Sequence, residues 1–218
     1  MPHPELLLLL LADARLPVGG HTQSGSLEGA VMAGLGAADV PSYLRARLLG
    51  ATRTEAGTAV AARRRVVDGG SLGDVDLAWQ ARTVTPALRA VSRTQAVSLL
   101  RLARGLWPAI EGVGLPDAPG RATVLGALAG LLGLDAEQVA RLVAYDDVQT
   151  VCAAALKLLP LDPAVATGWV AGALPAVEDV VSAVAGIEDP AEIPAVASPQ
   201  IEAWAQAHAR TTRRLFRA

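Results

Sequence analysis

The sequence predicts an all-α fold, a single-domain bundle of about eight to nine helices. Aromatic residues make up only 3% of the 218 residues, whereas 52% are hydrophobic. Strands favour aromatic and β-branched residues in alternating patterns, and few such alternations occur in this chain. Apolar residues instead recur at the spacing of one helix face, between blocks of polar and charged residues. These observations together favour helices throughout.

The expected helices follow from that spacing and from the glycines and prolines that interrupt it. The first contains the apolar run Leu6–Ala12, and Ser24 or Thr22 can cap the second, which carries Leu27. The full set runs near residues 4–14, 24–35, 40–67, 73–83, 86–107, 121–133, 136–158 and 164–186, with a ninth near 197–213.

Two long helices show the amphipathic pattern most clearly. In 40–67, Leu44 and Leu48 recur among arginines, and 86–107 repeats the pattern. Its apolar positions include Leu88, Val91, Val97, Leu100 and Leu102, and its basic ones Arg89, Arg93, Arg101 and Arg104.

Local signals place two further helix starts. Asp135 is a good N-cap for the helix 136–158, because its side chain can accept hydrogen bonds from unpaired backbone N–H groups. Glu178 and Asp179 follow Pro175, and we expect them in the first turn of a helix, where acidic side chains favour the helix dipole.

No segment has the composition of a long flexible linker, so residues 1–218 are expected to form one domain. The final segment, about 210–218, is a basic tail on an acidic chain. It either makes an electrostatic contact with a partner or is a solvated, frayed end. Its basic residues are Arg210, Arg213, Arg214 and Arg217.

Charge and hydropathy exclude several classes of protein. The net charge of −2 argues against general nucleic-acid binding. Mean hydropathy is high, at +0.37. The longest uninterrupted apolar run, Leu6–Ala12, is far shorter than the roughly 20 residues of a membrane span. We therefore expect no membrane segment, a cytoplasmic protein, and apolar surface that partners cover.

Single residues exclude other activities. Lys157 is the only lysine and lies in Ala-Leu-Lys-Leu-Leu, so the chain lacks the Gly-Lys-Ser/Thr of a phosphate-binding P-loop. Cys152 is the only cysteine, which excludes an internal disulfide. Its apolar neighbours predict a raised pKa and an inert thiol in the core.

No metal or catalytic constellation is predicted. The histidines His3, His21 and His208 show no metal-ligand spacing, although a transient or intersubunit site using His3 or His21 stays open. His208 is expected on a solvated polar helix face. Asp146 and Asp147 are adjacent on one helix and point some 100° apart, so they do not share a target well.

One loop stands out between the first two helices. It is dense in polar residues. It contains Pro17, which fixes the backbone angle φ, and Gly19 and Gly20, which permit positive φ or a close approach of the backbone. The loop resembles the UreF family of urease accessory proteins, whose pattern is Leu-Pro-x-Gly-small-aromatic-x-His/Tyr-Ser-x-Gly-Leu/Ile-Glu. The residues that match in register are Leu16, Pro17, Gly19, Gly20, Ser24, Leu27 and Glu28.

Three later segments extend the resemblance over essentially the whole chain. Residues 124–134 resemble the family's Gly-x-hydrophobic-Ala-x-x-Leu-Gly-Leu, and residues 157–161 resemble its basic-x-x-Pro-Leu. The ending Arg-Arg-Leu-Phe-Arg-Ala, residues 213–218, resembles Ser/Thr-Arg-Leu-Phe-x-Ser. The loop departs from the pattern at His21, Gln23 and Ser26, so no nickel contact is carried over to Gln23.

The resemblance implies an all-α, non-catalytic scaffold. Members dimerise, bind a UreD/UreH-type accessory protein and recruit a UreG-type GTPase that carries nickel to apo-urease. This chain would then bind no cofactor tightly, and the complex would handle nickel. The implied partner-binding residues are His21, Ser24, Glu28, Lys157, Arg214 and Phe216.

The resemblance further implies that the tail orders on complex formation and folds against His21. Protonated His21 would repel Arg214, so tail docking is expected to weaken below about pH 6.

Two other functions stay open. A helical ligand-binding regulator has about this length, but residues 4–35 contain only Arg15 as a basic residue for a recognition helix. A small helical metal-dependent enzyme could use Asp146 and Asp147 with a divalent ion on phosphate substrates, although it needs more facing acidic residues.

Overall fold

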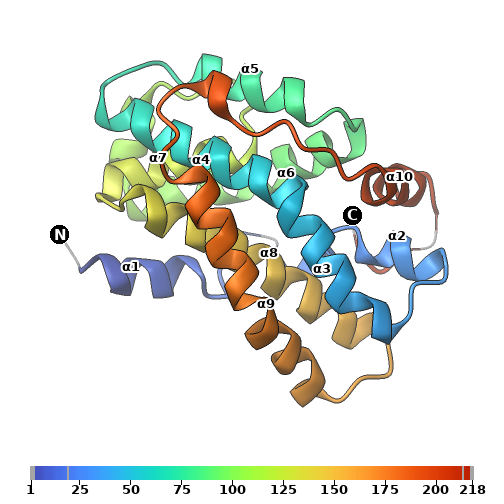
Figure 1. Ribbon diagram of the computed structural model, residues 1–218. Helices are drawn as coiled ribbons and strands as arrows, with labels where there is room; N and C mark the ends of the chain where they lie inside the picture. The colour runs from blue at the N-terminus through green and yellow to red at the C-terminus, as the bar shows by residue number, and fades with distance from the viewer. Residues whose placement is uncertain (1–2, 19, 213, 217–218) are drawn as a thin grey trace.

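A computed structural model of the chain describes residues 3–18, 20–212 and 214–216. Within these residues it contains ten α-helices, four short 3₁₀-helices and no strand, which confirms the all-α prediction (Figure 1). The α-helices are α1 (Pro4–Leu11), α2 (Leu27–Met32), α3 (Val40–Leu49), α4 (Ala51–Val67), α5 (Gly73–Arg82), α6 (Pro86–Leu106), α7 (Arg121–Leu132), α8 (Ala136–Leu158), α9 (Pro163–Val184) and α10 (Pro199–His208).

The single helix expected over 40–67 is two helices, α3 and α4, so the structure has ten α-helices in its described residues where nine were expected. Gly50 separates α3 from α4 with φ −110° and ψ −104°, outside the helical region. Its missing side chain also matters, because a Cβ there would collide with the Ser198 hydroxyl. The hydrophobic period continues through Gly50 and therefore predicted one continuous helix. The close contact of Gly50 with the loop that carries Ser198 is not visible in that pattern.

Helix α4 lies at the centre of the bundle, packed against α5, α7, α8 and α9. Two glycines let α7 approach it closely. A Cβ at Gly126 would collide with the carbonyl oxygen of Ala59, and one at Gly130 would lie 2.9 Å from the carbonyl oxygen of Arg63. The backbones of α4 and α7 therefore meet directly.

The starts of α8 and α9 test two local predictions. The Asp135 side chain accepts from the N–H of Gln138, and the Gln138 side chain accepts from the N–H of Asp135, so the predicted N-cap is confirmed. The prediction for Glu178 was wrong, because α9 begins at Pro163 and continues through Pro175. Proline at the first position of a helix is favourable, so Pro163 starts a helix here.

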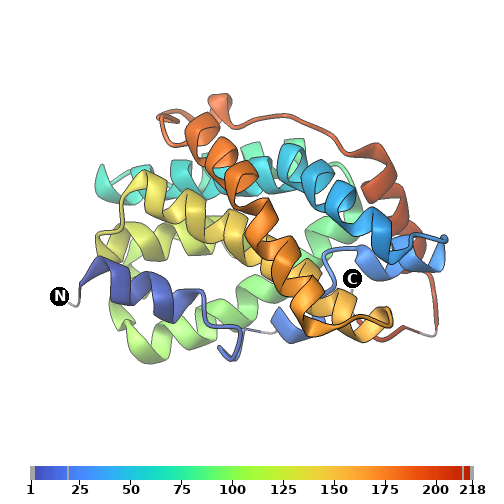
Figure 2. The same ribbon diagram turned by 60° about the horizontal axis from the view of Figure 1, so that its bottom comes forward.

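Helix α9 is long and apolar enough to cross a membrane by length and composition alone. Glycine, threonine and proline are interspersed along it, so it contains no long uninterrupted apolar run. A mostly buried core helix of a soluble protein meets the same criterion, but only 28% of the apolar stretch of α9 is buried. Here α9 packs along α8 and also contacts α3 and α4 (Figure 2).

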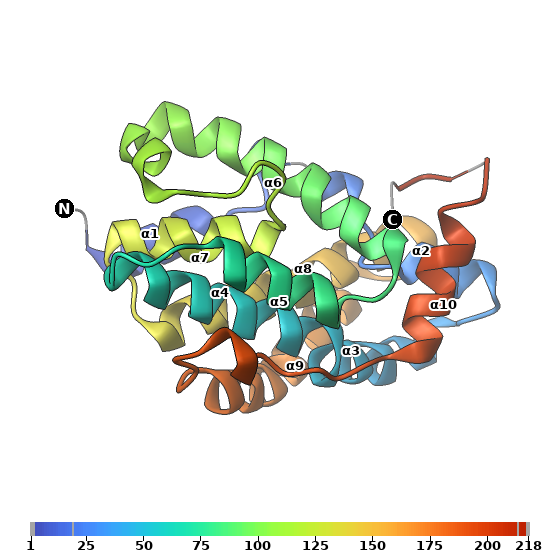
Figure 3. The same cartoon turned by 90° about the horizontal axis from the view of Figure 1, so that it is seen from above.

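The two ends of the chain lie at opposite ends of the bundle. Helix α1 lies at one end, whereas α2, α10 and the C-terminus lie together at the other (Figures 1 and 3). Contacts of α10 with α2 and α6 hold this second end together. The polar loop that precedes α2 and the basic tail that follows α10 are therefore neighbours.

Candidate partner-binding site

The chain after α10, residues 209–216 as far as they are described, returns to α2; we call it the tail. Its anchor is the carboxylate of Glu28, whose side chain is only 8% exposed. One carboxylate oxygen accepts from the backbone N–H of Leu215 at 2.6 Å, and the other accepts from that of Phe216 at 2.8 Å. Hydrogen bonds to a buried charged acceptor are stronger than those between neutral groups.

His208 is a third partner of Glu28. Its Nε2 lies 2.8 Å from a Glu28 oxygen, and both side chains are buried. In the tautomer that carries its proton on Nε2, the imidazole donates to this carboxylate. The prediction of a solvated His208 was wrong because Ile201, Ala205 and His208 share the buried face of α10. Their spacing of four and three residues was the signal that could have placed this histidine in the core.

Phe216 fixes the end of the tail. Its ring is buried, and the ammonium of Lys157, from α8, lies 5.3 Å from the ring centroid. That distance suits a cation–π contact. Leu215 is 63% exposed, and Lys157 and Arg214 are also exposed. The docked tail and Lys157 of α8 together form an outer surface, which we call the tail surface, with one apolar and two cationic side chains.

The polar loop supplies Ser24, which is fully buried. Its hydroxyl accepts from the backbone N–H of Glu28 at 3.3 Å, at the second residue of α2. Ser24 therefore caps this helix end as expected, although Ser26 holds the N-cap position and makes no side-chain cap. The cap orients the first turn of α2, which carries the tail's anchor.

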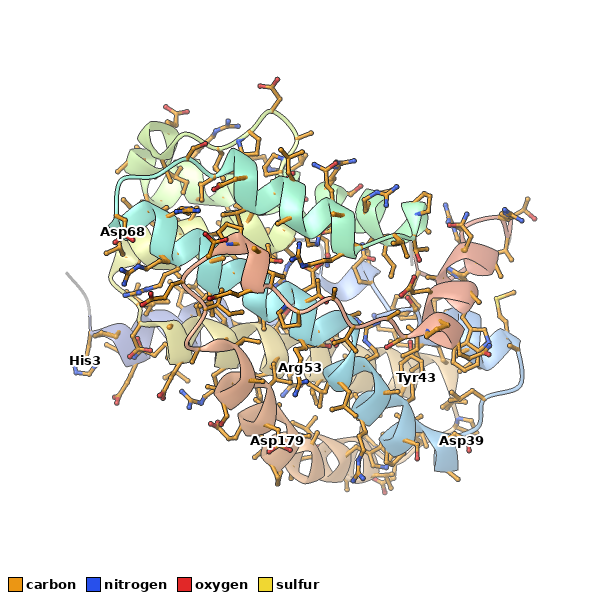
Figure 4. The ribbon with its side chains drawn as sticks, turned by 45° about the horizontal axis from the view of Figure 1, so that its top comes forward. His3, Asp39, Tyr43, Arg53, Asp68 and Asp179 are labelled. Atoms are coloured by element: carbon orange, nitrogen blue, oxygen red, sulfur yellow. The ribbon has the colours of Figure 1, made fainter. Side chains whose placement is uncertain are left out.

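The turn before α2 has an uncommon backbone. Gly25 has φ +57° and Ser26 has φ +68°, and the left-handed region is costly for a serine. The carbonyl oxygen of Gly25 accepts from the Tyr43 hydroxyl at 2.6 Å and from Nη1 of Arg47 at 2.7 Å. Figure 4 shows Tyr43 on α3, at the end of the molecule where α10 lies. Two side chains of α3 therefore hold the turn.

Arg47 is itself held from α8. Its Nε donates to Asp147 at 3.0 Å and its Nη2 at 2.5 Å, and Thr52 donates to the same carboxylate. Burial acts to raise the pKa of Asp147, but the charge and hydrogen bonds of Arg47 outweigh it, so the net pKa is lowered. We call Tyr43, Arg47 and Asp147 the loop clamp, which the sequence analysis did not predict.

The two adjacent aspartates of α8 have different partners. Asp147 belongs to the loop clamp, whereas Asp146 pairs with Arg121 at 2.8 Å. Within the described residues, no group of three or more His, Cys, Asp or Glu could hold a metal ion. Cys152 is buried, and burial raises the pKa of its thiol to about 11, as the sequence predicted in direction.

The structure brings most of the predicted site residues together. Ser24, Glu28, Lys157 and Phe216 form one cluster, and Arg214 lies on the same tail. His21 lies in the short 3₁₀-helix Gly20–Thr22, and its side chain lies outside the described part of the structure. The expected effect of His21 protonation on the tail therefore stays a prediction.

Known proteins match the chain over nearly its full length. A family model described as UreF matches residues 35–185. The urease accessory protein UreF of Mycobacterium sp. (strain JLS) is 37% identical over 211 residues, which cover 96% of each chain. The chain belongs to the UreF family. The urease accessory protein UreF of Mycolicibacterium vanbaalenii is 36% identical over 213 residues, covering 96% of each chain. That of Mycobacterium tuberculosis (strain ATCC 25618 / H37Rv) is 35% identical over 213 residues, covering 96% of this chain and 97% of the relative.

The match to the UreF family model covers only part of the site. Arg47, Asp147 and Lys157 lie inside residues 35–185, whereas Glu28 and Phe216 lie outside them. The contact between Glu28 and the tail thus joins two segments that flank the matched region.

Proposed function

We propose that this UreF-family chain is a non-catalytic scaffold in urease maturation. It binds a UreD/UreH-type accessory protein, and the pair recruits a UreG-type GTPase that carries nickel to apo-urease. Nickel is the cargo of the assembly and not a tightly bound cofactor of this chain. The protein acts in the cytoplasm as a homodimer and has no nucleic-acid or membrane partner.

The observation that carries this proposal is the anchoring of the tail on Glu28. In the docked arrangement Leu215, Lys157 and Arg214 form an exposed surface, beneath which the Phe216 ring is buried. An apolar centre with cations around it suits a partner surface that is apolar and acidic. If the tail is already anchored before a partner binds, binding has a smaller entropic cost, because the tail does not have to be ordered in that step.

Exposed leucines support the homodimer. Helix α1 presents Leu6, Leu9 and Leu10, which are 62%, 70% and 41% exposed. Exposed apolar patches of this kind mark protein–protein contacts. This patch lies at the opposite end of the bundle from the tail surface, so dimerisation and tail-directed recruitment need not compete (Figure 1).

Light scattering behind size exclusion tests the scaffold. The chain is run alone, with the UreD/UreH-type protein, and with that protein plus the GTPase loaded with nickel and GTP. We expect a dimer alone and a stable assembly of all partners in the last run. Deleting residues 214–218 should abolish the assembly and leave the dimer intact.

A matched pair of variants separates the tail from general charge effects. Glu28→Gln weakens the anchor and should reduce assembly, whereas Glu137→Gln, on the exposed face of α8, should not. A folded chain that binds neither partner in either form would contradict the scaffold and favour a ligand-binding regulator. Turnover of a phosphate substrate by the isolated chain would favour an enzyme.

A further inference from the structure

A polar cavity, partly open to solvent, lies beside the polar loop. It has a volume of about 120 Å³ and lies between α4, α6, α8 and the loop before α2. That volume holds several water molecules or one molecule of about four heavy atoms. Its wall includes Glu55 from α4, Gln95 from α6, Thr150 from α8 and Gln23 from the loop.

The charged side chains of the cavity wall already have partners. Arg47 pairs with Asp147 and donates to the Gly25 carbonyl oxygen, and Arg121 pairs with Asp146. Arg82 donates to the carbonyl oxygens of Ala78, Ala191 and Ile193, and Glu202 accepts from the Thr85 hydroxyl and the Ser198 N–H.

Glu55, the remaining charged group of the wall, also has a hydrogen-bond partner. One of its oxygens accepts from Trp79 Nε1 at 2.6 Å. Burial raises the pKa of Glu55, although the Trp79 hydrogen bond opposes the shift. The other charged groups of the wall are three cations and three anions: Arg47, Arg82 and Arg121 with Asp146, Asp147 and Glu202.

Two buried polar atoms of the wall have no partner among the described residues. The buried Oε1 of Gln23 and the buried Oγ of Ser26 make no hydrogen bond. Gln95 and Thr150, both half-buried, add an amide and a hydroxyl to the same wall. Amides and hydroxyls both donate and accept, so the wall offers hydrogen bonds of both kinds.

We propose that this cavity binds a small neutral molecule of the primary-amide class. A charged ligand would leave an unbalanced charge in a site whose ions are already paired. A purely apolar ligand would leave the amides and hydroxyls without partners. A primary amide presents a carbonyl acceptor and an NH₂ donor on one planar frame of about four heavy atoms, the size that the cavity admits.

The full-length chain is tested with four probes of the same shape. Acetamide is neutral with donors and an acceptor, acetone is neutral with an acceptor only, acetate is an anion and acetamidinium is a cation. Two-dimensional NMR titrations report both affinity and location. Acetamide alone should give saturable shifts, centred on the cavity wall, with a dissociation constant of about 0.1–10 mM, as expected for so few atoms.

Variants then locate the contacts. Thr150→Val and Gln95→Leu each remove a polar group of the wall, and each should weaken acetamide binding about fivefold. Thr94→Val is the control, because Thr94 is exposed on α6 and its hydroxyl donates to the Ala90 carbonyl. Glu55→Gln should keep binding, since it preserves the shape of the side chain and a neutral ligand does not need its charge. Thermal melts establish that each variant is folded.

Three results would overturn the proposal. Acetate or acetamidinium could bind as tightly as acetamide, which would make the cavity an ion site. Acetamide could give no saturable shift up to about 50 mM, well above the affinity expected for its size. A structure determined in acetamide could show ordered water alone in the cavity.

Discussion

The carboxylate of Glu28 accepts a hydrogen bond from the backbone N–H of Phe216, which lies 188 residues further along the chain. This contact, with that of Leu215, fixes these two tail residues on the first turn of α2. Both N–H groups belong to the main chain, so these two hydrogen bonds to Glu28 depend on the position of the tail backbone and not on the identity of its side chains. The anchor residue itself is the last of the polar-loop motif.

Replacing the anchor should release the tail. Glu28→Gln keeps the shape but replaces a charged acceptor of three hydrogen bonds with a neutral amide. We expect a loss of about 1–3 kcal/mol in the free energy that holds the tail in place. Hydrogen exchange at the Leu215 and Phe216 amides measures it directly, as faster exchange. Glu137→Gln is the control, and equal protection in both variants would contradict the anchor.

Phe216 should be the main source of docking energy from the tail's side chains. Phe216→Ala removes a buried ring and its contact with Lys157, so tail docking should weaken by about 1–3 kcal/mol. The tail can undock without unfolding the bundle, so the melting temperature should change little. Limited proteolysis should therefore cleave the tail of the variant early. Phe216→Leu keeps an apolar side chain, so its tail should be cleaved at a rate between those of the wild type and Phe216→Ala. Cleavage of Phe216→Ala as slow as that of the wild type would disprove the prediction.

The loop clamp should act on the tail from a distance. Tyr43→Phe removes one of the two hydrogen bonds to the Gly25 carbonyl and leaves the ring in place. The left-handed turn at Gly25 and Ser26 then loses part of its support, and Glu28 follows directly. We expect exchange at Phe216 to quicken about fivefold, the effect of one neutral hydrogen bond. Tyr145→Phe is the control, because Tyr145 lies on α8 and its hydroxyl accepts a hydrogen bond from Gln149.

Glu55 should make stability depend on pH. Its pKa is raised from the ordinary 4.5 in the folded protein, chiefly by burial. Between the ordinary and raised values the folded state holds a proton that the unfolded chain has lost, so the free energy of unfolding falls as pH rises through that window. Glu55→Gln should remove this fall. Urea denaturation between pH 4 and 8 measures it, with the exposed Glu188→Gln as control; the same slope in all three proteins would refute the assignment.

Hydrophobic period and capping chemistry were enough to predict most of the helices. Asp135 capped α8 as predicted because capping depends on local residues. The break at Gly50 could not be predicted, since it depends on Ser198, which lies far along the chain. The same holds for the site. The loop and tail motifs pointed to Glu28 and Phe216, but their hydrogen bond and the part played by Arg47 arise only from tertiary packing.

Glycine has opposite roles in two helices, and alanine substitution should separate them. A Cβ at Gly126 would collide with α4 backbone, whereas one at Gly172 in α9 would meet nothing within 4 Å. Gly126→Ala should therefore destabilise the protein by about 3 kcal/mol or more, because α4 and α7 must separate. Gly172→Ala should stabilise it by about 0.5–1 kcal/mol through helix propensity. Chemical denaturation measures both, and a stabilised Gly126→Ala variant would mean that α4 and α7 do not pack as closely as described.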